Sequence, residues 1–135
     1  MMSGEIRHHL QALLRKLGLS ESDSAVLSTL VLSRTPLSAE ELSKRTGYSL
    51  ASISLSLTRL RKNYMVEKRR EGGRYIYWPA KGVVENFTSF LREILEGHVK
   101  PFLRALEVEE DRAFNDLRRE LRELERTLKG LVERG

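Results

Sequence analysis

The basic side chains of this 135-residue chain gather in one segment, and their types and spacing suit the binding of phosphate groups. Residues 24–80 carry ten basic and four acidic side chains, a net charge of +6, whereas the whole chain carries +5. Seven of the ten lie close together: Arg59, Arg61, Lys62, Lys68, Arg69, Arg70 and Arg74. Only Glu67 and Glu71 oppose them. Such a cluster is either a solvated surface or a site for an anionic partner.

A serine-rich helix before these charges is the second candidate for chemistry. Ile53, Leu57 and Leu60 recur at helical spacing and predict the buried face of a helix over residues 49–62. The opposite face then offers small, hydroxyl and cationic side chains, which suit base edges and phosphates in a major groove. The predicted DNA contacts on this helix are Ser49, Ala51, Ser52, Ser56, Arg59 and Lys62, with Arg59 placed to contact guanine. The alternative is that the serines only cap the helix and fill space.

The elements that position this helix have clear boundaries. Apolar spacing predicts helices over residues 3–17 and 21–34, the second ending before Pro36. The segment Ser38–Glu41 has the pattern of a capping box and begins a short helix that ends at Thr46. Gly47 suits the positive φ that follows a helix end. Two short helices joined by this tight turn predict a helix-turn-helix.

A glycine-tipped hairpin is predicted over residues 65–78, directly after the second helix. Gly72 and Gly73 allow a two-residue turn, and Tyr75 to Trp78 have high strand propensity. Helix-turn-helix followed by hairpin is the order of a winged helix. Its cations are predicted to contact the DNA backbone or minor groove: Lys68, Arg69, Arg70 and Arg74. The alternative is that Arg69 and Arg70 pair with Glu67 and Glu71, but two acids cannot neutralise four cations.

The C-terminal region is predicted to be helical over 81–97, interrupted at Gly97 and Pro101, and again over 109–134. The last helix has an apolar seam at heptad spacing: Phe114, Leu117, Leu121, Leu124, Leu128 and Leu131. Glu120 and Glu125 would repel each other in a parallel pair. The seam is therefore expected to pack antiparallel on a second copy, or on the partner's N-terminal helix. The alternative is a hairpin within the chain, against the helix over 81–97.

Several segments resemble the MarR superfamily of winged-helix transcription regulators, with the GbsR-type branch nearest. The matching segments are LSAEEL (37–42), TGYSLASISLSLTRL (46–60), GRYIY (73–77) and the helical region 83–106 with Lys100-Pro101. The resemblance covers residues 18–106, and archaeal sugar-responsive regulators with similar winged helices are close competitors. It implies a homodimer that binds double-stranded DNA, with dimer contacts from helices outside the winged domain. It also implies a small-molecule effector, of unknown identity.

The expected fold is mostly α with a small β-hairpin. It comprises an N-terminal dimerisation helix (1–19), a winged helix-turn-helix (20–80) and C-terminal dimerisation helices (81–135). The predicted dimer contacts are the six seam residues together with Leu10, Leu13, Leu14 and Leu17. The expected function is that of a homodimeric, sequence-specific transcription regulator. The alternative is a winged helix that scaffolds a protein complex and leaves the basic wing unused.

Other classes of function find little in the sequence. The absence of Cys excludes thiolate zinc sites and cysteine nucleophiles, and His8, His9 and His98 form no cluster with acids. No catalytic triad or carboxylate pair is apparent, so an enzyme, a metal site and a cofactor are not expected. Neither a signal peptide nor a membrane span is apparent, and a cytoplasmic location is expected. The high charged content and the scarcity of side-chain amides resemble thermophile composition.

Overall fold

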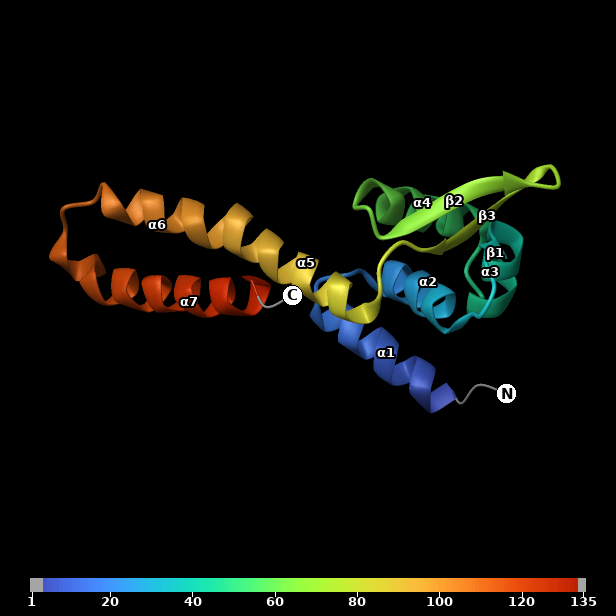
Figure 1. Ribbon diagram of the computed structural model, residues 1–135, viewed down its shortest axis with the longest axis horizontal. Helices are drawn as coiled ribbons and strands as arrows, with labels where there is room; N and C mark the ends of the chain where they lie inside the picture. The colour runs from blue at the N-terminus through green and yellow to red at the C-terminus, as the bar shows by residue number, and fades with distance from the viewer. Residues whose placement is uncertain (1–3, 134–135) are drawn as a thin grey trace. The chain divides into compact units, whose positions relative to one another are not determined.

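The computed structural model describes residues 4–133, and the chain forms two compact units, Met1–Gly82 and Val83–Gly135 (Figure 1). The first, here the winged unit, contains α1 (Gly4–Lys16), α2 (Glu21–Leu32), β1 (Leu37–Ser38), α3 (Ala39–Thr46), α4 (Leu50–Lys62), β2 (Val66–Glu71) and β3 (Arg74–Pro79). The second, here the hairpin unit, contains α5 (Val83–Ile94), a π-helical turn (Leu95–Val99), α6 (Lys100–Glu107), a 3₁₀ turn (Arg112–Phe114) and α7 (Asn115–Glu133). The predicted fold class, mostly helical with a small sheet, is confirmed.

The winged unit is built around α2, which packs against α1, α3, α4 and β3. Every residue from Asp23 to Leu30 is buried, so this helix has no solvent-facing stripe over two turns. Its buried hydroxyls bond to the preceding turn, Ser28 to the carbonyl of Ser24 at 2.6 Å and Thr29 to that of Ala25 at 2.8 Å. Because these polar groups find partners locally, a helix with several hydroxyl side chains can lie at the centre of the core.

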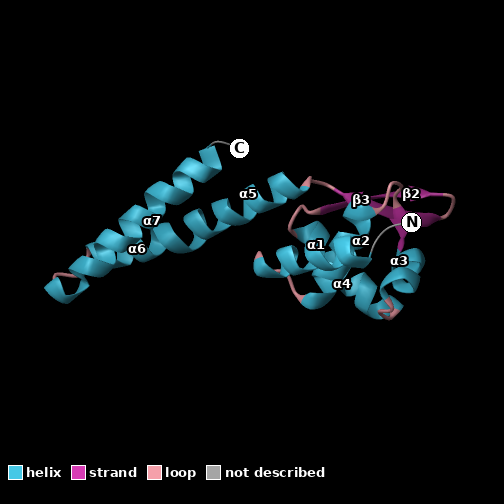
Figure 2. Cartoon of the chain, turned by 90° about the horizontal axis from the view of Figure 1, so that it is seen from below, coloured by secondary structure: helices cyan, strands magenta, loops and turns pink. Residues whose placement is uncertain are grey.

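The sheet, magenta in Figure 2, has three antiparallel strands in the order β1–β3–β2. The sequence predicted the β2–β3 hairpin but not β1, whose two residues pair as Leu37 with Tyr77 and Ser38 with Ile76. Gly72 and Gly73 have φ of 59° and 81°, the two positive values that a tight hairpin turn requires. The short first strand ties the base of the wing to the start of α3.

The hairpin unit pairs one long helical run with α7 (Figure 1). The expected interruption at Gly97 and Pro101 is absorbed by the π turn, in which the amide of Lys100 donates to the carbonyl of Leu95. Pro101, which has no amide hydrogen to donate, occupies the first turn of α6. Among residues 4–133, no helix has both the length and the apolar character needed to cross a lipid bilayer.

The core of the hairpin unit corrects part of the seam prediction. Leu128 of α7 is buried with Leu95, Val99 and Leu103, and Leu121 packs against this cluster. The structure therefore has the intrachain hairpin that the sequence offered as the alternative. Expecting Leu128 to face a second chain was wrong, because the antiparallel run α5–α6 already buries it, whereas Leu121 is only partly covered.

Candidate nucleic-acid interface

The orientation of α4 is fixed by hydrogen bonds at the end of α3 and at the start of α4. Gly47, at φ 81°, ends α3 and turns the chain, and the hydroxyl of Ser43 donates to the carbonyl of Tyr48 at 2.6 Å. The hydroxyl of Ser49 then accepts from the amide of Ser52 at 3.1 Å and caps the N-terminus of α4. These local bonds set the angle between the two helices of the helix-turn-helix.

The two faces of α4 differ as the sequence predicted. Ile53, Leu57 and Leu60 are buried, each with 2% or less of its surface exposed. The outer side chains that the sequence proposed for DNA contact are exposed or half-exposed: Ser49, Ala51, Ser52, Arg59 and Lys62. Leu55 and Thr58 are exposed on the same side. The outer surface of α4 has no carboxylate of its own, since the chain has no acid between Glu41 and Glu67.

Ser56 does not belong to this outer face. It is fully buried, its hydroxyl donates to that of Ser22 at 3.2 Å, and it accepts from Nη2 of Arg59 at 3.2 Å. The sequence placed Ser56 at the margin of the exposed face, and the packing of α2 against α4 turns that margin inward. The prediction that Ser56 contacts DNA is therefore wrong.

Arg59 is tied to α2. Its Nε lies 3.2 and 3.1 Å from the two carboxylate oxygens of Asp23, and its Nη2 lies 2.8 Å from Oδ1. Only 12% of the Asp23 side chain is exposed, against 48% for Arg59. Hydrogen bonding to Asp23 raises the pKa of Arg59. With Nε and Nη2 engaged by Asp23, the bidentate contact of Arg59 with guanine stays a prediction that would require this ion pair to open.

The wing brings all four of its predicted cations to the surface but in two different environments. Lys68 and Arg70 lie over the ring of Tyr75, at 4.1 and 5.8 Å from its centroid. Arg69 instead binds Glu71, with 2.9 Å between Nη2 and Oε2. Arg74 lies 3.6 Å from Oε1 of Glu41 on α3. Of the pairs that the alternative proposed, only Arg69 with Glu71 is present among the ion pairs of the described residues, and Arg74 pairs instead with Glu41 on α3.

Glu41 links the wing to the helix-turn-helix. Its Oε1 accepts from the amide and the hydroxyl of Ser38, both at 3.1 Å, while the hydroxyl of Ser38 accepts from the amide of Glu41 at 3.2 Å. The predicted capping box is confirmed. The pKa of Glu41 is lowered, chiefly by the hydrogen bond from the Ser38 amide, with burial opposing the shift and Arg74 adding to it.

The sequence did not predict the roles of two residues in this region. Tyr64 joins α4 to the wing with a φ of 59°, in the left-handed region, and is 77% exposed. Its amide donates to the carbonyl of Arg61 and that of Met65 to Leu60, the bonds of a Schellman motif. Glycine is the usual signal for this turn and is absent here. The ion pair of Asp23 with Arg59 was also missed, because nothing in the spacing of residues links the two.

The remaining predicted dimer contacts fall into three groups by exposure. Leu14 and Leu17 are buried within this single chain, at 2% and 6% exposure, so the prediction that they contact a partner is wrong. Leu10 and Leu117 are half-buried. The others are exposed apolar side chains: Leu13, Phe114, Leu124 and Leu131. Within the described part of the chain, no group of three acidic or histidine side chains is arranged to hold a metal ion.

The chain is similar to several solved structures, among them the following three. A protein described as a transcriptional regulator aligns over 96% of this chain and 95% of its own, with 19% identity and a TM-score of 0.63. A MarR family transcription regulator aligns over 97% and 85%, with 16% identity and a TM-score of 0.49. A homodimeric winged helix-turn-helix DNA-binding domain from Mycobacterium bovis aligns over 72% and 94%, with 26% identity and a TM-score of 0.45.

Comparison with family models gives a more specific result. No curated protein matches the chain significantly. The family model described as "Sugar-specific transcriptional regulator TrmB" matches residues 14–82, which is just over half of the chain and includes the whole helix-turn-helix and wing. The GbsR-type branch is not confirmed by these comparisons, and the match corresponds to the sugar-responsive regulators that the sequence also resembles. The chain belongs to the TrmB family of transcriptional regulators.

Proposed function

We propose that this regulator acts as a homodimer that binds specific sites on double-stranded DNA. The helix α4 would lie in the major groove and the wing on the adjacent backbone. The observation that carries the proposal is the outer surface of α4 and β2. It presents Lys62, Lys68 and Arg70, none of which has a carboxylate partner among the described residues. A DNA target also agrees with the cytoplasmic location expected from the sequence.

The exposed hydroxyl and apolar groups of α4 support contacts with bases. Ser52, Leu55 and Thr58 face outward between the cap at Ser49 and the cation Lys62. Hydroxyls can donate to or accept from base edges, and an apolar side chain can contact a thymine methyl. Cations on the flanking wing would fix the register on the duplex without reading sequence.

The dimer is proposed to form through the hairpin unit. Phe87, Phe102, Leu124 and Leu131 are each more than 40% exposed, and they leave apolar surface on both arms of the hairpin. A second copy is the partner proposed for this surface because sequence-specific winged helices use two half-sites about one helical turn apart. Leu13 on α1 offers a further exposed apolar contact.

Salt dependence of binding tests the proposal. If Lys62, Lys68 and Arg70 of two protomers meet phosphates, the plot of log K against log salt should have a slope of about −5. Fluorescence anisotropy measures this slope, with a duplex selected from random sequence and salt varied from about 50 to 300 mM. A slope near zero would contradict DNA binding and favour the protein-interaction alternative. Sugars are the effector class to add first to the complex, given the description of the family.

A further inference from the structure

The two faces of the wing carry different charge. Side chains that pair directly across an antiparallel ladder share a face, and successive residues alternate between faces. The register pairs Lys68 with Tyr77 and Arg70 with Tyr75, which defines one face, here the Tyr75 face. The other, here the Trp78 face, holds the pairs Glu67 with Trp78, Arg69 with Ile76 and Glu71 with Arg74. The first face therefore has two cations and no acid, and the second has two cations and two acids.

The acids of the Trp78 face are engaged with its donors. Arg69 bonds to Glu71 through Nε at 3.2 Å and Nη2 at 2.9 Å, and lies over the ring of Trp78. The indole of Trp78 donates to Glu67 at 3.0 Å. Arg74 is drawn toward Glu41 on α3. Exposed ion pairs of this kind are weak, but the carboxylates themselves would repel an approaching phosphate.

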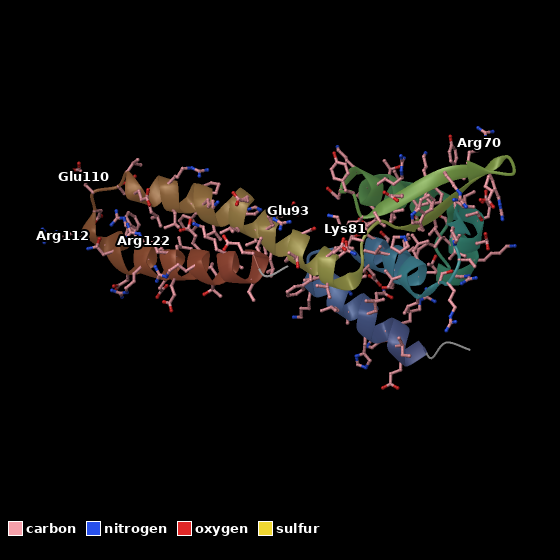
Figure 3. All side chains as sticks on the ribbon, in the orientation of Figure 1. Arg70, Lys81, Glu93, Glu110, Arg112 and Arg122 are labelled. Carbon is pink, nitrogen blue, oxygen red and sulfur yellow. The ribbon has the colours of Figure 1, made fainter. Side chains whose placement is uncertain are left out.

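The Tyr75 face is arranged differently. Lys68 and Arg70 flank one aromatic ring, and no carboxylate is bonded to either within residues 4–133. Figure 3 shows Arg70 projecting from the wing. An aromatic ring holds a cation without neutralising it, so both side chains keep their charge and their N–H donors for another anion. The contact also restricts two long side chains, which lowers the entropy lost when they bind.

We propose that the wing binds the phosphodiester backbone through the Tyr75 face alone, with Lys68 and Arg70 as the phosphate contacts and Tyr75 as their support. Arg69 and Arg74 then belong to the internal ion pairs of the wing and contribute no phosphate contact. This inference rests on the proposed DNA binding and divides the four wing cations into two that bind and two that do not. It removes Arg69 and Arg74 from the four wing cations that the sequence predicted to contact DNA.

Two double variants of equal charge test this division. Lys68→Gln/Arg70→Gln and Arg69→Gln/Arg74→Gln each remove two positive charges per protomer, so any general effect of net charge is the same. The first should flatten the salt slope of the dimer by about 3.5, because four phosphate contacts are lost. The second should leave the slope within about half a unit of wild type. Equal losses, or a larger loss for Arg69→Gln/Arg74→Gln, would overturn the inference.

The wild-type slope distinguishes failure of the proposed DNA binding from failure of the proposed role of the Tyr75 face. A wild-type slope near −5 with both variants unchanged would overturn the role of the Tyr75 face and leave DNA binding in place. A wild-type slope near zero would overturn DNA binding and the inference with it. Thermal melting of each variant shows whether its fold is intact.

The ring and the opposite face give two readouts that need no charge change. Tyr75→Leu keeps both cations, so the slope should stay as in wild type while affinity falls about threefold. Unchanged affinity would overturn the proposal that the ring supports the two cations.

Trp78 is the only tryptophan and is half-exposed on the Trp78 face. Acrylamide should quench its fluorescence equally in the free protein and in the DNA complex. Strong protection on binding would overturn the assignment of faces.

Discussion

The winged unit and the hairpin unit bury their apolar residues in different ways. In the winged unit α2 is enclosed by three helices and a strand, and Val26 and Leu27 have no exposed surface. In the hairpin unit α7 meets a single helical run, and one cluster around Leu95 and Leu128 forms the buried core. A helix enclosed on all sides needs no further partner, whereas a helix in a two-layer hairpin can bury only one stripe.

Both units leave apolar side chains uncovered. Those of the winged unit lie on α1, on α4 and in or beside the wing: Ile6, Leu13, Leu50, Leu55, Tyr64 and Tyr75. The hairpin unit exposes apolar side chains on all three of its helices: Val84, Phe87, Phe102, Leu124 and Leu131. An apolar surface of this kind on a transcription regulator is where a second copy would add stability by mass action. In the proposed dimer, the hairpin unit is therefore the part expected to gain the most stability from association.

Breaking the proposed dimer should give the largest effect. Leu124→Glu/Leu131→Glu places two acids on the exposed apolar stripe of α7 and should convert a dimer to a monomer in sedimentation velocity. Loss of the second half-site should weaken binding to a palindromic duplex on the order of 10²-fold. Arg122→Gln/Lys129→Gln is the matched control, because it changes net charge equally at exposed positions of α7 (Figure 3). An unchanged sedimentation coefficient for the first variant would contradict the comparison.

The stability of the winged unit can be tested through the tie between α2 and α4. Arg59→Ala leaves the mostly buried Asp23 without its ion pair, which should cost about 1–3 kcal/mol of unfolding free energy. Urea denaturation followed by Trp78 fluorescence reports on this unit, since the only tryptophan lies in it. Arg61→Ala, at an exposed position of the same helix, should stay within about 0.5 kcal/mol. Equal stability of the two variants would show that Asp23 does not hold α4.

The parts of this unit that the sequence predicted are those with local signals. Helix ends are marked by residues that act on the backbone within a few positions. Ser38 and Ser49 accept hydrogen bonds from free amides of the first turn, and Gly47 adopts the left-handed conformation that ends α3. The apolar face of α4 follows from helical periodicity alone. The caps at Ser38 and Ser49 and the buried positions Ile53, Leu57 and Leu60 were accordingly predicted correctly.

The parts that the sequence missed depend on contacts between distant residues. Arg59 and Asp23 are 36 positions apart, and the two residues of β1 pair with β3, which lies far along the chain. Ser56 was misplaced because its burial depends on how closely α2 approaches α4. The heptad seam has an apolar face wide enough for two neighbours, so its spacing could not tell an intrachain helix from a second copy.

The capping box gives a smaller, pH-dependent effect. Glu41→Gln should cost about 1 kcal/mol at pH 7, since the ionised carboxylate accepts two bonds from Ser38 and attracts Arg74. A carboxyl with a lowered pKa in the folded state stabilises above its unfolded pKa and loses this contribution as pH falls through the folded value. The difference between variant and wild type should therefore shrink below about pH 4.

Urea midpoints of variant and wild type measure this effect at about pH 7 and about pH 3.5, above and below the usual pKa of a glutamate carboxyl. Glu40→Gln, an exposed neighbour on α3, serves as control and should change stability little at either pH. A cost for Glu41→Gln that is the same at both pH values would show that the Glu41 charge is not what stabilises the box.

The smallest effect is expected where α4 passes into the wing. Tyr64 holds a positive φ that costs a non-glycine residue about 1–2 kcal/mol, and its exposed ring has little packing to lose. Tyr64→Gly removes that strain but adds about 0.5–1 kcal/mol of unfolded-chain entropy, so we expect a net gain of about 0.5–1 kcal/mol. Asn63→Gly, one residue earlier at φ −94°, has no strain to relieve and should only lose stability. If both glycine variants lower the unfolding free energy equally, the positive φ of Tyr64 does not strain the winged unit.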